Sequence, residues 1–114
     1  MLPSKYRLKG EESFEKVKSQ GTLFQSTSFG LLTFNRGDNM SPRVGFIVST
    51  KVSKKAVDRN KIKRILRKVF RPRLDEIKQG YDILVLAKKR VLEEDLESLS
   101  KELARVLKLA NLIE

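Results

Sequence analysis

The sequence predicts a small α+β domain, a two-layer sandwich in which helices cover a central sheet and the elements follow the order αβββαβα. Three observations favour this class. Helical and strand-like periodicities alternate along the chain, without an internal repeat or a linker. Residues 81–87 are almost uniformly apolar, as a central strand requires. With 114 residues and 39% hydrophobic content, the chain suffices for one core, so residues 1–114 are predicted to form a single domain.

The first half of the chain is predicted to contain one short helix and three strands. Acidic residues open the helix and Gly21 follows its end, as is typical of helix termini. Thr, Phe and Leu dominate the strands, and residues 36–39 form a turn. Ile47 breaks the alternation of the third strand, which favours burial on both sides. The predicted boundaries are 11–19 for the helix and 22–26, 29–35 and 43–49 for the strands.

The second half is predicted to contain a basic helix, a central strand and a long C-terminal helix. Pro72 is expected to end the basic helix, because the residue before a proline is disfavoured in the helical region. Acidic residues 93–95 suit the start of the last helix, where the helix dipole favours negative charge. The predicted boundaries are 50–55 for a basic loop, 56–71, 81–87 and 92–110. The apolar face of the last helix is predicted to comprise Leu92, Leu96, Leu99, Leu103, Val106, Leu107 and Ala110.

Positive charge is concentrated in residues 51–73. This segment holds eleven basic residues and one acid, a net charge of +10, whereas the whole chain has a net charge of +11. Cations gathered so densely repel one another in the folded state, and a polyanionic partner is the usual reason for such a cluster. The segment is therefore a candidate binding surface.

The basic segment has helical order, which a disordered basic tail lacks. Its apolar residues fall within about 120° on a helical wheel, and the polar residues fill about 160° of the opposite side. The apolar set is Ile62, Ile65, Leu66, Val69 and Phe70; the polar set is Asn60, Lys61, Lys63, Arg64, Arg67, Lys68 and Arg71. One side of this helix is suited to burial, and the other is suited to contact phosphates.

Three interpretations of the basic face compete. An ordinary solvated face mixes both signs of charge, whereas this face has like-charged pairs four residues apart, such as Lys63 and Arg67. A membrane-surface helix needs a free apolar side and an interfacial anchor, but this apolar side is needed for the core and the chain has no Trp. Nucleic acid is favoured. Because a strand and not a helix precedes the basic helix, folded RNA fits better than a helix-turn-helix contact with DNA.

The composition argues against catalysis by this chain. It has no Cys and no His, and so lacks thiolate metal ligands and the commonest general base. The acids at 75–76, 82 and 93–95 fit structural roles, so no catalytic or metal-binding residue is predicted. No apolar run reaches the ~18 residues of a membrane span, and no signal peptide is apparent. A cytoplasmic location is therefore expected.

Aromatic residues offer a second candidate surface. A sheet with exposed aromatics beside positive charge can stack single-stranded bases. Core packing is the commoner role of each one, but Phe14 lies on a short helix that can direct it into a groove. The candidates are Phe14, Phe24, Phe29, Phe34 and Phe46.

Arg59-Asn60-x-x-Lys63-Arg64-x-x-Arg67 resembles the RNR motif of the protein subunit of bacterial ribonuclease P. The strand at 43–51 is similar to the family's strand before the basic loop. Residues 8–14, with Val17 and Gly21, resemble the family's first helix and turn, and Ala87-Lys88-Lys89 fits the strand before its last helix. The resemblance therefore extends over most of the chain.

The resemblance implies a ribonucleoprotein enzyme. Its RNA subunit is the catalyst and uses Mg²⁺ to remove the 5′ leader of precursor tRNA, while the protein binds both RNAs. The implied partners are thus the RNA subunit and precursor tRNA, without a membrane, an obligate protein partner or a cofactor held by the protein alone. The RNA-binding residues are predicted to be Lys51, Lys54, Lys55, Arg59, Asn60, Lys61, Lys63, Arg64, Arg67, Lys68 and Arg71. The leader cleft is predicted to include Phe14, Lys18, Leu32 and Arg43.

Two positions depart from the family's pattern. Lys18 stands where members often have a second aromatic, and Leu32 stands where a strand tyrosine can occur, so weaker stacking and stronger electrostatics are expected. The family also implies a left-handed βαβ crossover around the basic helix, against the general right-handed preference. The alternatives are a structural RNA-binding protein of the ribosomal type and a nuclease acting by itself.

Overall fold

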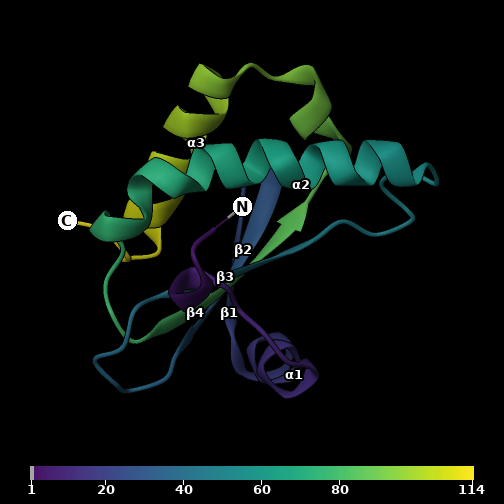
Figure 1. The fold of residues 1–114 in the computed structure, drawn as a ribbon. Helices are drawn as coiled ribbons and strands as arrows, with labels where there is room; N and C mark the ends of the chain where they lie inside the picture. The colour runs from purple at the N-terminus through teal and green to yellow at the C-terminus, as the bar shows by residue number, and fades with distance from the viewer. Residues whose placement is uncertain (1) are drawn as a thin grey trace.

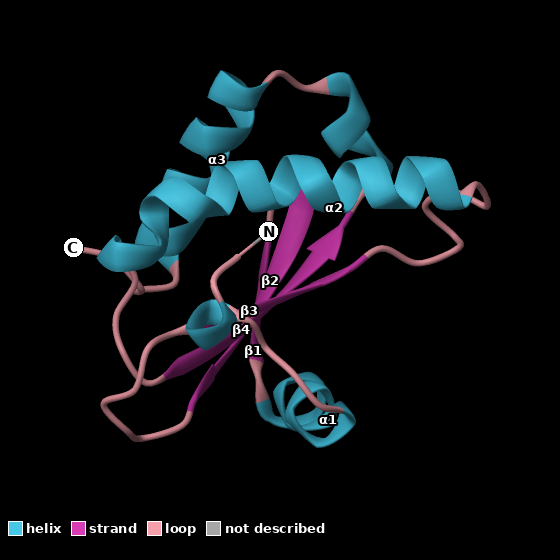
Figure 2. Cartoon of the chain, in the orientation of Figure 1, coloured by secondary structure: helices cyan, strands magenta, loops and turns pink. Residues whose placement is uncertain are grey.

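The computed structural model describes residues 2–114, which form a four-stranded sheet with helices on both faces (Figures 1 and 2). The strands are β1 (Thr22–Gln25), β2 (Phe29–Asn35), β3 (Arg43–Ile47) and β4 (Tyr81–Ala87). The helices are α1 (Glu11–Gln20), α2 (Ala56–Phe70) and α3 (Leu96–Leu109), and short 3₁₀ helices span Ser4–Tyr6, Arg71–Glu76 and Lys89–Glu93. Apart from the 3₁₀ helices the order is αβββαβα, which confirms the predicted α+β class.

The strands lie in the order β1-β2-β4-β3. β2 pairs antiparallel with β1 and β4, whereas β3 pairs parallel with β4. β4 is therefore central, which explains its almost uninterrupted apolar sequence. The connection from β3 to β4 passes through α2 and forms a βαβ crossover, whose left-handedness stays a prediction from the resemblance.

Alternate residues of the sheet serve two apolar clusters. Leu31 and Val85 face α2 and α3 in the main core, whereas Leu32 and Leu84 lie on the opposite face, in the cluster that α1 covers with Val17. This division follows from the period of two along each strand. The sheet thus separates α2 from α1 and positions two different surfaces.

The end of α2 differs from the prediction. The helix ends within a residue of the expected boundary, but Arg71 keeps helical angles (φ −50°, ψ −48°) and Pro72 lies in the following 3₁₀ helix. The expectation that Pro72 would force the preceding residue out of the helical region is wrong. Proline lacks an N–H but fits the first turn of a new helix, where that donor has no partner to lose.

The start of the last helix also differs from the prediction. α3 begins at Leu96 and not at residue 92, because the Asp95 carboxylate caps it by accepting a hydrogen bond from the Ser98 N–H (2.8 Å). Leu92 consequently lies in a 3₁₀ helix, and Leu96 is 51% exposed. Leu99, Leu103, Val106 and Leu107 are buried as predicted.

Two strands are shorter than predicted. β1 ends at Gln25 and β3 ends at Ile47, one and two residues early. β3 lies at the edge of the sheet, and Ile47 is half-buried, so burial on both sides is incomplete. No helix within residues 2–114 is long and apolar enough to cross a membrane.

Candidate nucleic-acid interface

α2 presents its two sides as the sequence predicts. Ile62, Leu66, Val69 and Phe70 are buried in the main core, and Ile65 is half-buried. The polar residues lie on the outer side of the helix, which crosses one face of the sheet (Figure 1). Asn60, Lys61, Arg64, Lys68 and Arg71 are exposed, as are Lys51, Lys54 and Lys55 of the preceding loop; Arg59, Lys63 and Arg67 are half-buried.

The cations of this surface lack acidic partners inside the protein. In the described part of the chain, no lysine or arginine between Lys51 and Lys68 lies within 4.0 Å of a carboxylate oxygen. Asp58, the one acid nearby, accepts a hydrogen bond from the Ser53 hydroxyl (3.0 Å). Arg59 donates to the Ser53 carbonyl oxygen (2.8 Å), so this arginine is tied to the loop backbone while its neighbours face solvent. We call the exposed and half-buried lysines and arginines from Lys51 to Lys68, together with Asn60, the α2 cationic face.

Part of the α2 cationic face is hollowed. Arg64, Arg67, Lys68 and Arg71 line a depression of about 170 Å³ whose remaining wall is Leu2. Leu2 is only 3% exposed, so the N-terminal segment is packed against the helix. Arg64, Arg67 and Lys68 have no carboxylate partner in the described residues, and their charges repel one another unless an anion lies among them. The hollow therefore suits the phosphates of a nucleic acid.

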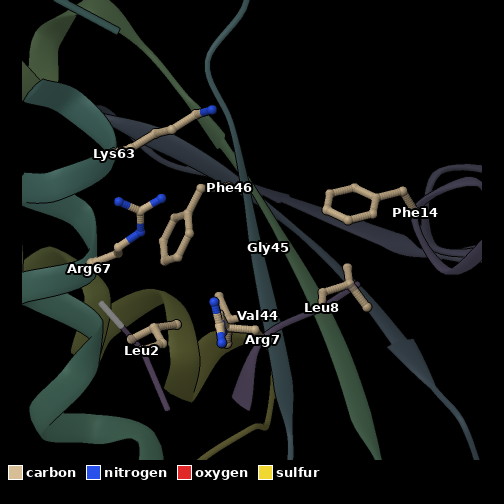
Figure 3. Close-up of a pocket in the computed structure, with 9 residues that line it drawn as sticks. All are labelled: Leu2, Arg7, Leu8, Phe14, Val44, Gly45, Phe46, Lys63 and Arg67. Atoms are coloured by element: carbon tan, nitrogen blue, oxygen red, sulfur yellow. The ribbon is translucent and has the colours of Figure 1, made fainter. Parts of the chain in front are cut away.

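A second pocket lies at the free edge of β3, which we call the β3-edge pocket (Figure 3). It joins α1 to α2, because Phe14 of α1 forms one wall and Lys63 and Arg67 of α2 form another. Gly45 makes the close approach of Phe14 possible, since a Cβ there would lie 2.9 Å from Phe14 Cζ. The lining residues are Leu2, Arg7, Leu8, Phe14, Val44, Gly45, Phe46, Lys63 and Arg67.

The four predicted leader-cleft residues lie on the α1 side of the sheet but have different surroundings. Phe14 and Leu32 are half-buried in the same apolar cluster. Lys18 is exposed, with its Nζ 3.9 Å from the Glu15 carboxylate. Arg43 stands apart from the other three, because it is bound to a buried carboxylate.

That carboxylate belongs to Asp82, whose side chain is 5% exposed. Arg43 donates to both of its oxygens, from Nε at 2.8 Å and from Nη2 at 2.9 Å. Arg36 donates to Oδ1 at 2.6 Å and also binds Asp38. The hydrogen bond from Arg36, followed by that from the Met40 N–H, lowers the pKa of Asp38. Sequence reasoning missed Arg36, although a lone acid in an apolar strand is a signal for a buried cationic partner.

The remaining aromatic candidates divide between core and surface. Phe29 is completely buried, whereas Phe24, Phe34 and Phe46 are half-buried. The Phe46 ring meets Phe70 edge-on, with centroids 5.4 Å apart. Lys16 Nζ lies 5.8 Å from the centroid of Phe34, beside α1. Phe14 and Phe34 therefore remain partly accessible on the α1 side of the sheet, and Phe46 on the α2 side.

Metal-ligating side chains do not gather in residues 2–114: no three His, Cys, Asp or Glu residues form a group that could hold an ion. Two of the acidic residues considered above instead make contacts within the protein. Asp82 binds two arginines, and Asp95 caps α3. The arrangement is suited to binding a polyanion.

Comparison with known proteins points to one family. A family model described as Ribonuclease P matches residues 2–111. A ribonuclease P protein component from Pseudanabaena sp. is 34% identical, with 99% of this chain and 97% of that protein covered. A counterpart from Geobacillus kaustophilus is 36% identical, with 94% and 88% covered.

Solved structures give the same result for the fold. The RNase P protein of Staphylococcus aureus has a TM-score of 0.81 and 30% identity, with 96% of this chain and 98% of that chain covered. The RNase P protein of Thermotoga maritima has a TM-score of 0.77 and 31% identity, with 90% and 94% covered. The similarity thus covers the sheet and the helices on both of its faces.

Proposed function

The chain belongs to the ribonuclease P protein family, and we propose that its α2 cationic face binds the RNA subunit while the α1 side of the sheet holds the 5′ leader of precursor tRNA. Membership makes the chain a protein component of bacterial-type ribonuclease P, an endoribonuclease that pairs such a protein with an RNA. We assign cleavage of the leader to that RNA, and the binding of RNA to this chain.

The observation that carries the proposal is that no lysine or arginine from Lys51 to Lys68 pairs with a carboxylate of the described residues. Cations without a carboxylate partner can each neutralise a phosphate and release a counterion, which is the main source of salt-dependent affinity. Arginine forks and the Asn60 amide can also contact the irregular backbone of folded RNA. The proposed role of α2 is therefore to bring two phosphate-rich molecules together by reducing their repulsion.

The α1 side supports the proposed contact with the leader. Phe14 offers an accessible ring beside β3, and Leu32 offers an aliphatic surface on the sheet. Lys18 adds an exposed cation on α1, partly balanced by Glu15. A single strand can stack one base on an aromatic ring and leave its backbone near a cation. Arg43 takes part here mainly by fixing the start of β3 through Asp82.

Mg²⁺ enters this proposal as an ion of the holoenzyme. The side chains of residues 2–114 provide no cluster that would fit it, so we assign its ligands to RNA. Protein cations that lower phosphate repulsion should reduce the Mg²⁺ concentration needed for the RNAs to associate. The chain has neither His nor Cys, and the proposal requires no proton transfer by its side chains.

The test combines purified protein, ribonuclease P RNA and precursor tRNA at low Mg²⁺. We expect the protein to stimulate cleavage at the leader junction, and the doubly substituted Arg64→Gln, Arg67→Gln protein to stimulate it less. Binding without stimulation would contradict the proposal and favour a structural RNA-binding protein of the ribosomal type. Cleavage by the protein without the RNA would contradict the assignment of catalysis to RNA.

A further inference from the structure

We propose that the β3-edge pocket receives one unpaired nucleobase of RNA, with the phosphate of that nucleotide held by Lys63 and Arg67. This inference rests on the proposed function, because it deepens the contact of α2 with RNA. It adds a base-binding site to a surface that otherwise contacts phosphates. The pocket brings together an aromatic wall, the edge of β3 and two cations of α2, with Arg7 of the N-terminal segment as a third cation in its lining.

The size and the lining of the pocket suit one aromatic ring system. Its volume is about 180 Å³, and an apolar cavity of about 150 Å³ is known to take benzene. Phe14 and Phe46 lie on opposite sides of β3, with Gly45 between them (Figure 3). The Phe14 ring and Leu8 occupy the space beside Gly45 itself, so the open part of the pocket lies next to the ring of Phe14 and toward Phe46 and α2. A base there would contact Phe14 or Phe46 and rest against the backbone.

The backbone at this edge offers hydrogen-bonding groups. The Val44 carbonyl oxygen accepts from the Leu8 N–H (3.0 Å), so the main-chain groups of Val44 point away from β4. Two residues further along the strand, the N–H and C=O of Phe46 point the same way. The pairing with the N-terminal segment is an isolated bridge between Arg7 and Val44, so it does not extend to Phe46. Phe46 thus offers a donor and an acceptor, as the Watson–Crick edge of a base requires.

The charges around the pocket select a phosphate-bearing ligand. Lys63 and Arg67 are about one helical turn apart on α2 and form the rim. Neither lies within 4.0 Å of a carboxylate in the part of the chain described. Arg67 also lines the hollow that holds Arg64 and Lys68, so an RNA backbone can run from the hollow to the pocket. An added peptide strand would use the same edge of β3, but it would leave both cations without an anion.

The first experiment follows the amide resonances of the whole protein by NMR during titration with AMP, and in parallel with ribose 5-phosphate. We expect AMP to shift Gly45 and Phe46 in a saturable manner, and ribose 5-phosphate to shift mainly residues of α2. Equal effects of both ligands on Gly45 and Phe46, or no effect of AMP on them, would overturn the proposal. The proposal would also be overturned if a neutral tripeptide shifted the amide resonance of Phe46 and AMP did not.

A pair of matched variants tests the phosphate contact. Lys63→Gln should weaken AMP binding about tenfold, since a hydrogen bond to a charged group contributes about 1.5 kcal/mol. Lys108→Gln removes the same charge from an exposed position on α3 and should leave AMP binding unchanged. Equal affinities of the two variants for AMP would contradict the assignment of Lys63.

The base can come from the RNA subunit or from the leader, and a Phe46→Leu variant distinguishes the two sources. If the variant loses affinity for ribonuclease P RNA and keeps its affinity for leader RNA, the base belongs to ribonuclease P RNA. If it loses affinity for leader RNA and keeps its affinity for ribonuclease P RNA, the base belongs to the substrate. Unchanged affinity for both would overturn the pocket. Because Phe46 also packs on Phe70, the melting temperature is measured alongside; the AMP titration of the unmodified protein needs no variant. If AMP binds the pocket while the Arg64→Gln, Arg67→Gln protein keeps full affinity for ribonuclease P RNA, the proposed binding of that RNA by α2 is contradicted. The assignment of the pocket as a nucleobase site then still holds.

Discussion

Arginine side chains have different partners on the two sides of the sheet. On the α1 side, Arg36 and Arg43 converge on the buried carboxylate of Asp82, with distances of 2.6 and 2.8 Å. On the α2 cationic face, Arg64 and Arg67 have no carboxylate partner in the described chain. Arginines of the first kind stabilise the fold, whereas those of the second kind are available to a ligand. Pairing inside the protein, and not the number of cations, therefore distinguishes the two regions.

The largest effect is expected from Asp82→Asn, which tests whether the paired arginines of the α1 side stabilise the fold. The substitution leaves two guanidinium groups without their buried carboxylate, and loss of one partner of a buried ion pair costs about 3 kcal/mol. Urea denaturation should show a free energy of unfolding lower by about this amount. Asp75→Asn, at an exposed position, serves as the control and should change the free energy of unfolding by less than about 0.5 kcal/mol. Equal stability of the two variants would contradict the structural role assigned to Asp82.

A smaller effect is expected from Phe14→Leu, which tests whether the α1 side binds the leader. Stacking of one base on an aromatic ring contributes about 1–3 kcal/mol, so binding of precursor tRNA should weaken about fivefold or more. Leucine keeps much of the apolar contact with the cluster around Leu8, so the fold should be retained. Affinity for mature tRNA, which lacks the leader, should stay unchanged. Equal losses for precursor and mature tRNA would remove Phe14 from the leader cleft.

The smallest effect concerns acid stability and Asp95. The hydrogen bond from the Ser98 N–H lowers the pKa of Asp95 below its ordinary value of 3.8. Because the folded-state pKa is the lower one, this stabilisation is present above about pH 4 and is lost as the pH falls through the folded-state value. Asp95→Asn keeps a capping side chain but cannot titrate. Its melting temperature should therefore fall less steeply than that of the unmodified protein between about pH 4 and pH 2. Identical acid profiles would exclude this contribution.

Elements with a strong period could be predicted from the sequence, and their ends could not. The apolar face of α2 and the central position of β4 follow from spacing and composition alone. The start of α3 depends on competition among three successive acids for the capping position, and only Asp95 has the required geometry. Likewise, the chain around Pro72 continues as a 3₁₀ helix because residues 71–76 still pack on the core through Leu74.

The candidate site shows the same division. Exposure of Arg64 and Lys68 follows from the helical period, because the opposite side of α2 must be buried. Engagement of Arg43 by Asp82 depends on the pairing of β3 with β4, which brings together residues 39 positions apart. Proximity of Phe14 to Gly45 likewise requires the packing of α1 on the sheet. Contacts between distant elements are thus what the sequence pattern alone leaves open.

The most direct test of the account is the salt dependence of binding to ribonuclease P RNA. Affinity is measured over a range of salt concentrations for the unmodified protein, Arg64→Gln, Arg67→Gln and a control, Lys101→Gln, whose lysine is paired with Glu97 (3.4 Å). Each arginine variant should reduce the slope of log K against log salt by about one, the loss of one phosphate contact, and the control should keep the full slope. Equal slopes for all four proteins would contradict the claim that the α2 cationic face binds RNA.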